Sequence, residues 1–449
     1  MNQLSRSLRT LQFFSLGGLI STSIVFLAPQ SGYSVQKDSV SPTNPKEIVD
    51  EVWQVVNRNY VDSTFHHTDW QATRRQLLSK NYTSKKQAYN AIRAALKTLG
   101  DPYTRFLDPN EFAQLNAETS GELSGIGVKL GMDKKTKALT VIEPVENSPA
   151  FKAGLRTGDR ILGIDGKLTQ GMDAEKATSL IRGTAGTTVK LKIARQGQKN
   201  FDVAINRAVI HISNVKSALK QEGNNRIGYI RLSGFDAHAS DEVRQAIQTL
   251  SAQKAQGFIL DLRGNPGGLL DAAINISRLW LHTGDIVRTV DRDSQDERIA
   301  ADQTAVTQLP LTVLVDGNSA SSSEILAGAL KDNQRATVVG TKTFGKAAVQ
   351  GVHPLPDGSG VNVTVAHYYT PKGTDINKKG IIPDVAIALT KAEAKKLAEN
   401  PKLVASPSDP QYLQAVRTVS KQIQAYKPFS NVTFMSMDRS VAGTQPSWK

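Results

Sequence analysis

The chain has 449 residues, so at roughly 150 residues per domain we expect about three domains. Hydrophobic residues make up 39% and charged residues 21%, a globular composition that excludes collagen-like, coiled-coil and wholly disordered chains. The net charge is +14, but the cations are spread along the chain without a long run, so we expect no nucleic-acid partner. The absence of cysteine excludes a disulfide framework, a thiol nucleophile and a Cys-ligated metal.

Residues 1–33 are predicted to be a targeting segment. Arg6 and Arg9 precede an apolar stretch that runs from Leu11 to Ala28. A positive start followed by such a stretch is typical of an export signal. The stretch is about as long as a bilayer is thick, so the segment is either cleaved or kept as a membrane anchor. In both cases we expect the rest of the chain to work outside the cytoplasm.

Residues 45–118 are predicted to form a helical region. Asn44-Pro45-Lys46-Glu47 offers a helix cap, a proline in the first turn and an acid at the third position. Apolar residues then recur at helical spacing. We expect further helices over 70–78 and 85–99.

Residues 119–207 are predicted to form a small β-rich module with two helices, because short β-type runs alternate with glycines there. The expected strands cover 127–130, 139–145, 160–164 and 188–193, and the expected helices cover 149–153 and 173–181.

Residues 208–390 are predicted to form an α/β core, because strand and helix patterns alternate and imply some parallel pairing. The expected strands cover 228–232, 258–262, 311–315, 337–340 and 361–369, and the expected helices cover 241–251, 269–281 and 322–332. Residues 391–449 should be helical to about 427 and end in a loose tail.

Ser321 is the candidate nucleophile. It lies between a predicted strand and a predicted helix, and Ser321-Ser322-Ser323-Glu324 is also the S-x-x-E signature of a capping box. The two interpretations are compatible. A serine at a helix N-terminus lies beside unpaired backbone N–H groups and the positive end of the helix dipole, which favours an oxyanion.

Lys346 is the candidate base, because no histidine lies in a recognisable triad context. A lysine can act as a base if burial lowers its pKa by about 3 units from its reference value of about 10.4, which takes roughly 4 kcal/mol. A competing interpretation is a phosphate loop, since Gly340 to Lys346 fits G-x-x-x-x-G-K. Ala347 then stands where that motif needs Ser or Thr, which disfavours a nucleotide site.

Two glycine-rich segments are candidate binding elements. Arg263 to Gly268 follows a buried strand and opens a helix, so its backbone N–H groups can approach a ligand or simply form a tight turn. Ser124, Gly125, Ile126 and Gly127 precede a strand, and such a loop can offer N–H groups to a peptide carboxylate while the strand edge accepts the peptide.

Together these residues give a family resemblance over about residues 45–390. The chain resembles the carboxyl-terminal processing proteases, which are tail-specific Ser/Lys endopeptidases. The resemblance rests on an ordered series of motifs: DPYTRFL (101–107), SGIGV (124–128), SPAFKAGLRTGDRILGIDG (148–166), LDLRGNPGG (260–268), NSASSSEILAGAL (318–330), GTKTFGKAAVQ (340–350) and YYTPKG with GIIPDV (368–385).

The resemblance implies specific roles. It makes Ser321 the nucleophile, Lys346 the base, Gln350 a residue that orients the lysine and Glu324 a supporting acid. It implies oxyanion donors from the backbone N–H groups of Gly267, in LDLRGNPGG, and of Ser322, in NSASSSEILAGAL. Ser322 stands where the family usually has alanine, and Thr374-Asp375 departs from the family pattern after TPKG.

The implied protein is an exported serine endopeptidase of multidomain α/β fold. A PDZ module, inserted between the helical region and the mixed α/β core, would bind apolar C-terminal tails of protein substrates. No metal or organic cofactor is implied. The expected location is the periplasm or the thylakoid lumen, with membrane attachment and an activator or adaptor protein left open. The alternative is a non-catalytic PDZ scaffold, whose mark would be the loss of the serine or the lysine.

Overall fold

The computed structural model describes residues 10–14, 23–27, 44–133 and 136–426. The predicted targeting segment lies outside these residues apart from two short strands, β1 (Thr10–Phe14) and β2 (Ser23–Leu27), and the predicted loose tail lies outside them too. In the described ranges, no helix combines the length and the apolar character needed to cross a bilayer. Cleavage or retention of the segment stays a prediction.

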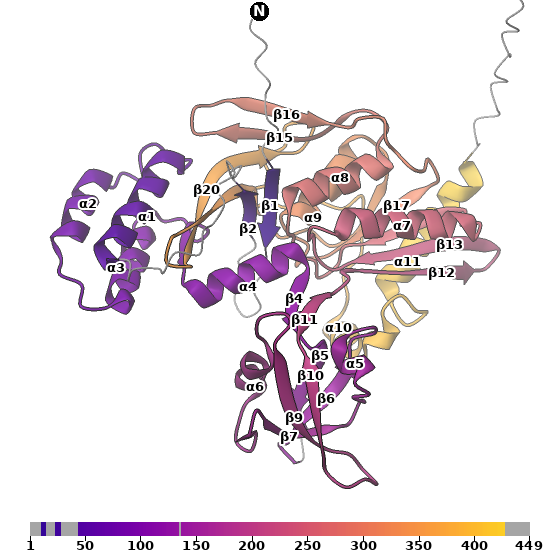
Figure 1. Cartoon of the computed structure of the whole chain (residues 1–449). Coiled ribbons are helices and arrows are strands. Elements are labelled where there is room, and N and C mark those ends of the chain that lie inside the picture. The colour runs from indigo at the N-terminus through magenta and orange to yellow at the C-terminus, as the bar shows by residue number, and fades with distance from the viewer. Residues whose placement is uncertain (1–9, 15–22, 28–43, 134–135, 427–449) are drawn as a thin grey trace, which may run out of the picture.

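Three helices form the N-terminal lobe at the left of Figure 1: α1 (Pro45–Asn59), α2 (Trp70–Ser79) and α3 (Lys85–Lys97). The predicted cap of α1 is confirmed, because the Asn44 side chain accepts a hydrogen bond from the Lys46 N–H. The helices bury Val52, Val56 and Ile92 against one face of a β-sheet. A fourth helix, α4 (Pro109–Ser120), crosses toward the centre of the molecule.

The sheet behind these helices is antiparallel in its described centre. Its strand order is β1-β2-β19-β20-β15-β16, with β3 paired to β20. The strands not yet given are β3 (Arg105–Leu107), β15 (Asp285–Asp291), β16 (Asp296–Ala300), β19 (Ala348–Pro354) and β20 (Gly360–Tyr369). Side chains alternate along β20, so Val361 and Val363 pack on the helical lobe while Asn362 and Thr364 face the other side.

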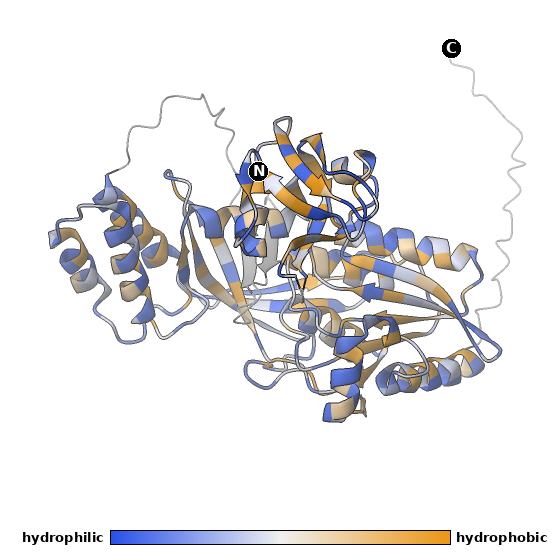
Figure 2. Cartoon of the chain, turned by 90° about the horizontal axis from the view of Figure 1, so that it is seen from below, coloured by the Kyte–Doolittle hydropathy of each residue, from blue (hydrophilic) through white to orange (hydrophobic). Residues whose placement is uncertain are grey.

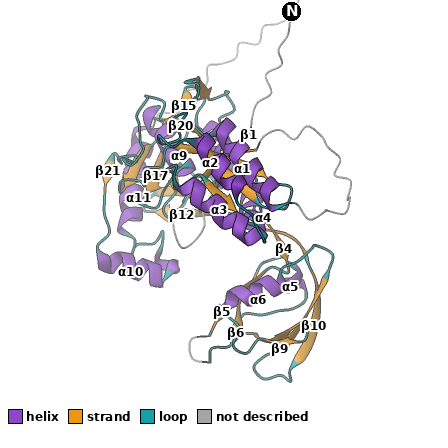
Figure 3. Ribbon diagram, turned by 90° about the vertical axis from the view of Figure 1, so that its left-hand side faces the viewer, coloured by secondary structure: helices purple, strands orange, loops and turns teal. Residues whose placement is uncertain are grey.

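Two paired strands, β4 (Glu122–Gly125) and β11 (Ala208–His211), connect the β-rich module to the rest of the molecule, as Figure 3 shows. Its main sheet has the order β10-β9-β7-β6-β5, so β5 is an edge strand. The elements are β5 (Val128–Met132), β6 (Leu139–Pro144), α5 (Pro149–Lys152), β7 (Arg160–Ile164), β8 (Lys167–Leu168), α6 (Ala174–Ile181), β9 (Thr188–Ala194) and β10 (Phe201–Asn206).

The second large sheet has the order β12-β13-β14-β17-β18-β21, and every pair after β12-β13 is parallel. This confirms the predicted α/β core. Its strands are β12 (Val215–Glu222), β13 (Asn225–Leu232), β14 (Gly257–Asp261), β17 (Leu311–Val315), β18 (Thr337–Gly340) and β21 (Val385–Ala386).

Helices cover both faces of this sheet, which explains why β14 and β17 are buried along their whole length. One face carries α7 (Ala239–Ala252), α8 (Leu270–Trp280) and α9 (Ser322–Asp332). The C-terminal part adds α10 (Lys391–Glu399), a 3-10 turn (Pro401–Leu403) and α11 (Pro410–Ala425), of which α11 packs on the other face. The helices carry hydrophobic and hydrophilic residues on different sides (Figure 2).

Candidate active site

Ser321 lies in the turn between β17 and α9. Its φ of 59° is unusual for a residue with a side chain and stores backbone strain. Ser321 is fully buried, and its Oγ has no hydrogen-bond partner among the described residues. The Glu324 side chain accepts the Ser321 N–H at 2.8 Å, so this part of the predicted capping box is made. A strained residue with an unsatisfied hydroxyl is typical of a functional position.

Lys346 is fully buried, just before β19. Its Nζ donates to Gln350 Oε1 at 2.9 Å and lies 4.4 Å from the centre of the Tyr103 ring. Burial lowers the pKa of Lys346 well below its ordinary value, the charge of Asp101 opposes this, and the nearby positive charge of Arg105 adds to it. The neutral amine is therefore favoured, which is the form a general base needs.

Glu324 holds the segments of Ser321 and Lys346 together through their backbones. The Oε2 atom that accepts the Ser321 N–H also accepts the Lys346 N–H at 3.0 Å. The Oε1 atom accepts the Gly345 N–H at 2.7 Å and the Thr343 hydroxyl at 2.6 Å. Burial raises the pKa of Glu324, and these four hydrogen bonds oppose the rise. The carboxylate thus positions both segments without contacting either functional atom.

This arrangement also argues against a phosphate loop. In such a loop the backbone N–H groups cradle phosphate and a helix follows the lysine. Here the N–H groups of Gly345 and Lys346 donate to Glu324, and the strand β19 follows.

Gln350 lies on β19 opposite Thr364 of β20. Its Nε2 donates to the Thr364 hydroxyl at 3.4 Å, and that hydroxyl donates to Asp101 at 2.6 Å. A polar chain therefore runs from Lys346 through Gln350 and Thr364 to Asp101, and it fixes the side chain that accepts from the Lys346 Nζ.

Sequence reasoning gave no role to Tyr103, Thr364 or Tyr368, although the first and last lie in quoted motifs. Tyr103 covers the Lys346 amine. The Tyr368 hydroxyl contacts the backbone carbonyls of Ser321 and Lys346, so it ties the two segments a second time. A tyrosine beside a glycine- or proline-rich turn was the only local signal, and it does not reveal these partners.

Gly267 lies directly against the nucleophile turn. A Cβ atom on Gly267, whose φ is 110°, would stand 2.9 Å from the Ser321 Cβ and 3.2 Å from the Ser322 nitrogen. The Gly267 N–H donates to Asn265 Oδ1 at 2.9 Å in this structure. Ser322 is the first residue of α9, where the N–H has no partner within the helix. Its hydroxyl donates to the Gly268 carbonyl at 3.0 Å.

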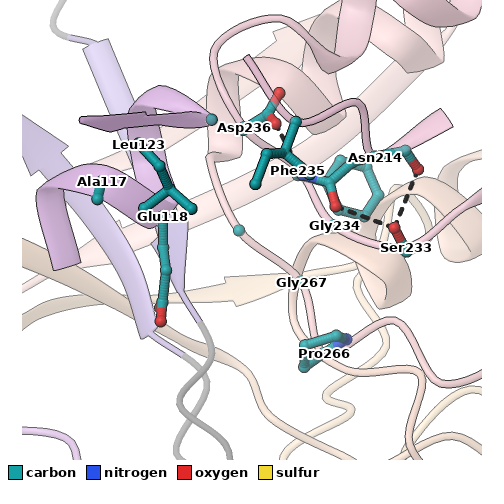
Figure 4. A pocket seen from close by; sticks show the side chains of 13 residues that line it. Ala117, Glu118, Leu123, Asn214, Ser233, Gly234, Phe235, Asp236, Pro266 and Gly267 are labelled. Atoms are coloured by element: carbon teal, nitrogen blue, oxygen red, sulfur yellow. Dashed lines mark hydrogen bonds between the residues drawn. The ribbon is translucent and has the colours of Figure 1, made fainter. Parts of the chain in front are cut away.

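A cavity of about 270 Å³ leads from β4, where the β-rich module joins the rest of the molecule, toward Gly267 (Figure 4). It is lined by Glu118 of α4, Leu123 of β4, and Phe235 and Asp236 of the segment after β13. The cavity therefore connects the module side of the molecule with the glycine beside Ser321.

The predicted peptide-binding segment lies at the entry of the module. Ser124 and Gly125 belong to β4 rather than to a loop, and the Ser124 hydroxyl donates to the Gly183 carbonyl at 2.6 Å. Ile126 is buried in the module's core, and Gly127 has a φ of 74° just before the edge strand β5. The edge strand and the neighbouring helix α6 are the elements that can receive an extended peptide.

Comparison with known proteins finds similarity over most of the chain. The sequence profile of Peptidase family S41 matches residues 226–387, and that of the PDZ domain matches residues 140–195. A carboxyl-terminal-processing protease of Synechocystis is 38% identical over 431 residues, covering 95% of this chain and 98% of that protein. One from Picosynechococcus is 42% identical, covering 78% and 84% respectively.

A chloroplastic C-terminal processing peptidase of Tetradesmus obliquus is 38% identical over 75% of this chain and 76% of that protein. Among solved structures, a photosystem II D1 C-terminal processing protease superposes with a TM-score of 0.52. That structure is 35% identical, and the match covers 82% of this chain and all of that chain.

Proposed function

Because the chain belongs to the carboxyl-terminal-processing proteases of peptidase family S41, with a PDZ domain, we propose that Ser321 and Lys346 form its catalytic dyad. The observation that carries the assignment is a buried Lys346, where burial favours a neutral amine, and a buried serine hydroxyl without a partner, on two segments that Glu324 holds together. The non-catalytic scaffold is not favoured, since both residues are present.

The proposed reaction has two halves. Neutral Lys346 Nζ takes the proton from Ser321 Oγ as the oxygen attacks the scissile carbonyl, and the proton passes to the leaving amine when the peptide C–N bond breaks. Water, deprotonated by Lys346, then cleaves the acyl-enzyme and restores Ser321. Backbone N–H groups of Gly267 and Ser322 stabilise the tetrahedral oxyanion.

Two hydrogen bonds in the structure bear on this reaction, and one of them must be released. The Lys346 Nζ donates to Gln350, and the Gly267 N–H donates to Asn265. A neutral Lys346 can keep its bond to Gln350 and still accept a proton on its lone pair. The Gly267 bond has to be released for an oxyanion. We therefore assign this conformation to a resting state, which substrate or an activator protein converts.

Substrate tails are proposed to enter through the PDZ domain. An apolar C-terminal tail adds to the edge strand β5 beside α6, with its carboxylate at the segment from Ser124 to Gly127. The chain upstream of the tail then follows the cavity lined by Glu118 and Phe235 to Gly267. Such a path supports tail recognition, because the cavity runs from β4, at the base of the module, to Gly267 beside the nucleophile turn.

The protein is proposed to act after export, in the periplasm or the thylakoid lumen. The support is the positive and then apolar segment of residues 1–33, which serves as a signal or as a membrane anchor.

The test is proteolysis by the purified protein, its Ser321→Ala variant and its Lys346→Ala variant. Substrates are an unfolded protein and peptides with apolar C-termini, either free or amidated. We expect both variants to lose cleavage while keeping their circular dichroism spectra, and amidation to weaken cleavage by wild type. Equal cleavage by wild type and Ser321→Ala would remove Ser321 from the mechanism, and indifference to amidation would remove the tail's carboxylate from recognition.

A further inference from the structure

Arg105 and Asn362 form a polar pair on the sheet face that carries Gln350. Asn362 lies directly opposite Arg105 of β3, and opposite Val352 of β19 on its other side. Directly paired residues in neighbouring strands project to the same face. The pair is therefore one row along the sheet from the row that contains Gln350 and Thr364.

Asn362 is buried, Arg105 is half-buried, and both have unsatisfied polar atoms. Asn362 is fully buried, and neither its amide oxygen nor its amide nitrogen has a hydrogen-bond partner. The buried Nε and Nη2 atoms of Arg105 also have no partner. These statements hold for the ranges that the structure describes. Nearly all buried polar side chains are hydrogen-bonded in native proteins, so two adjacent unsatisfied ones indicate a place for a ligand.

The charges around Arg105 act on the guanidinium without a direct ion pair. Glu111 and Glu118 are the carboxylates whose charge acts on it, and Glu111 pairs with Arg93 at 2.8 Å. Glu118 Oε2 is buried without a partner, and burial raises the pKa of Glu118. Over the described part of the chain, Arg105 makes no ion pair, and its positive charge reaches Lys346.

The residues on either side of the pair place it between an apolar cluster and the proposed catalytic groups. On the same face, the next row carries Leu107, which packs with Leu115 of α4 and with Val352. The other neighbouring row leads to Gln350 and Lys346. Glu118, on the same helix as Leu115, lines the cavity that reaches Gly267. The pair thus lies between an apolar cluster and the proposed catalytic groups.

We propose that Arg105 and Asn362 form a subsite for a carboxylate of the substrate. This inference rests on the proposed function. The planar Arg105 guanidinium matches a carboxylate, and the Asn362 amide nitrogen adds a donor. Rows two residues apart along a strand are separated by about 7 Å, the length of about two residues of an extended peptide. The subsite therefore lies about that far from Gln350 along the sheet, and it selects a carboxylate at one position near the scissile bond.

The experiment uses a series of otherwise neutral peptides. Each peptide carries one Asp at one of the four positions on either side of the cleaved bond. Its matched substrate has Asn at the same position. The readout is the ratio of kcat/KM for the Asp peptide to that for the Asn peptide. For wild type we expect a ratio of about tenfold or more at one position and about one elsewhere. Because the ratio is taken within one variant, it does not depend on the fraction of folded enzyme.

Three variants and a control decide the assignment. We expect Arg105→Met to bring the ratio to about one, Asn362→Leu to lower it, and Arg105→Glu to favour a Lys peptide instead. The control is Arg93→Met, which removes an equal charge from α3 and should leave the wild-type ratio. A ratio of one at every position in wild type, or a ratio unchanged by Arg105→Met, would overturn the proposal.

The source of the carboxylate is tested by peptides shortened until their free C-terminus falls at the selected position. If the subsite takes a terminal carboxylate, amidation of these peptides lowers their kcat/KM in wild type and not in Arg105→Met. If it takes a side chain, only the Asp series responds. Ser321→Ala in the same assay separates the two proposals: residual cleavage contradicts the dyad, whereas an Arg105-independent ratio contradicts only the subsite.

Discussion

The backbone N–H of Lys346 donates to the Glu324 carboxylate at 3.0 Å, while the Lys346 amine points to a different set of partners. The carboxylate therefore fixes the position of the lysine segment without forming an ion pair with the amine. From where it lies, its charge raises the pKa of Lys346 by less than burial lowers it, whereas direct contact with the Nζ would stabilise the ammonium further. Burial can lower that pKa because the nearest strong acceptor of the Nζ is the neutral amide of Gln350.

Lys346→Met is expected to abolish proteolysis, by about 10³-fold or more, and to raise thermal stability. The pKa of Lys346 lies below the unfolded-state value of about 10.4, so the unfolded chain binds the proton more tightly. The cost of burying the lysine thus grows as the pH falls from about 10.4 to the folded-state pKa, and is constant below it. Calorimetry should find the largest gain in Tm near neutral pH and almost none near pH 10.5. Lys396→Met, on the exposed side of α10, is the control.

Gln350→Glu is expected to shift the pH profile of cleavage toward higher pH. The substitution places a carboxylate 2.9 Å from the Lys346 Nζ, which favours the ammonium and raises the pKa of Lys346. The pH at which kcat/KM rises, as Lys346 loses its proton, should increase by about one to three units, the usual effect of an adjacent opposite charge. Gln350→Met, which lacks the charge, should lower activity without that upward shift. A profile unchanged in Gln350→Glu would contradict Lys346 as the titrating base.

Glu324→Gln is expected to destabilise the protein and reduce its activity. Glu324 accepts four hydrogen bonds with its two oxygens, and a glutamine can accept with only one of them. The other donors would face an NH₂ group, at about 1–3 kcal/mol for each buried donor left unsatisfied. Urea unfolding should show this loss.

The matched control is Glu393→Gln in the capping box of α10, which is made by the same motif at an exposed position. It should cost less than about 1 kcal/mol. Equal losses at the two sites would mean that Glu324 serves only as a helix cap.

Gly267→Ala is expected to remove activity even where folding survives. The added Cβ would lie 2.9 Å from the Ala320 carbonyl oxygen and from the Ser321 Cβ, so the nucleophile turn has to move. Gly264→Ala is the control, because Gly264 also has a positive φ but its Cβ would meet nothing closer than 4.0 Å. The control variant should lose only the stability that a Cβ at positive φ costs, about 1–2 kcal/mol. Cleavage rates and unfolding curves of the two variants separate crowding at Ser321 from strain alone.

The sequence by itself determined the elements whose signals are local. The cap at Asn44, the fully buried strand Leu311–Val315 and the helix that starts at Ser322 follow from side chains within a few residues of one another. The ordered motifs also gave the family resemblance and pointed to Ser321 and Lys346, because seven motifs follow one another along the chain in the family's order. The boundaries predicted for the domains stay predictions.

Only the tertiary structure decided what surrounds these two residues. Tyr103 and Asp101 reach Lys346 across more than 240 positions of the sequence, and Arg105 meets Asn362 only because β3 pairs with β20 in one register. The short strand β3 carries no pattern that specifies its partner, and a shift of one residue would turn Arg105 to the opposite face. Desolvation, register and the exchange of hydrogen bonds at Gly267 depend on contacts between distant segments, so no local pattern could have predicted them.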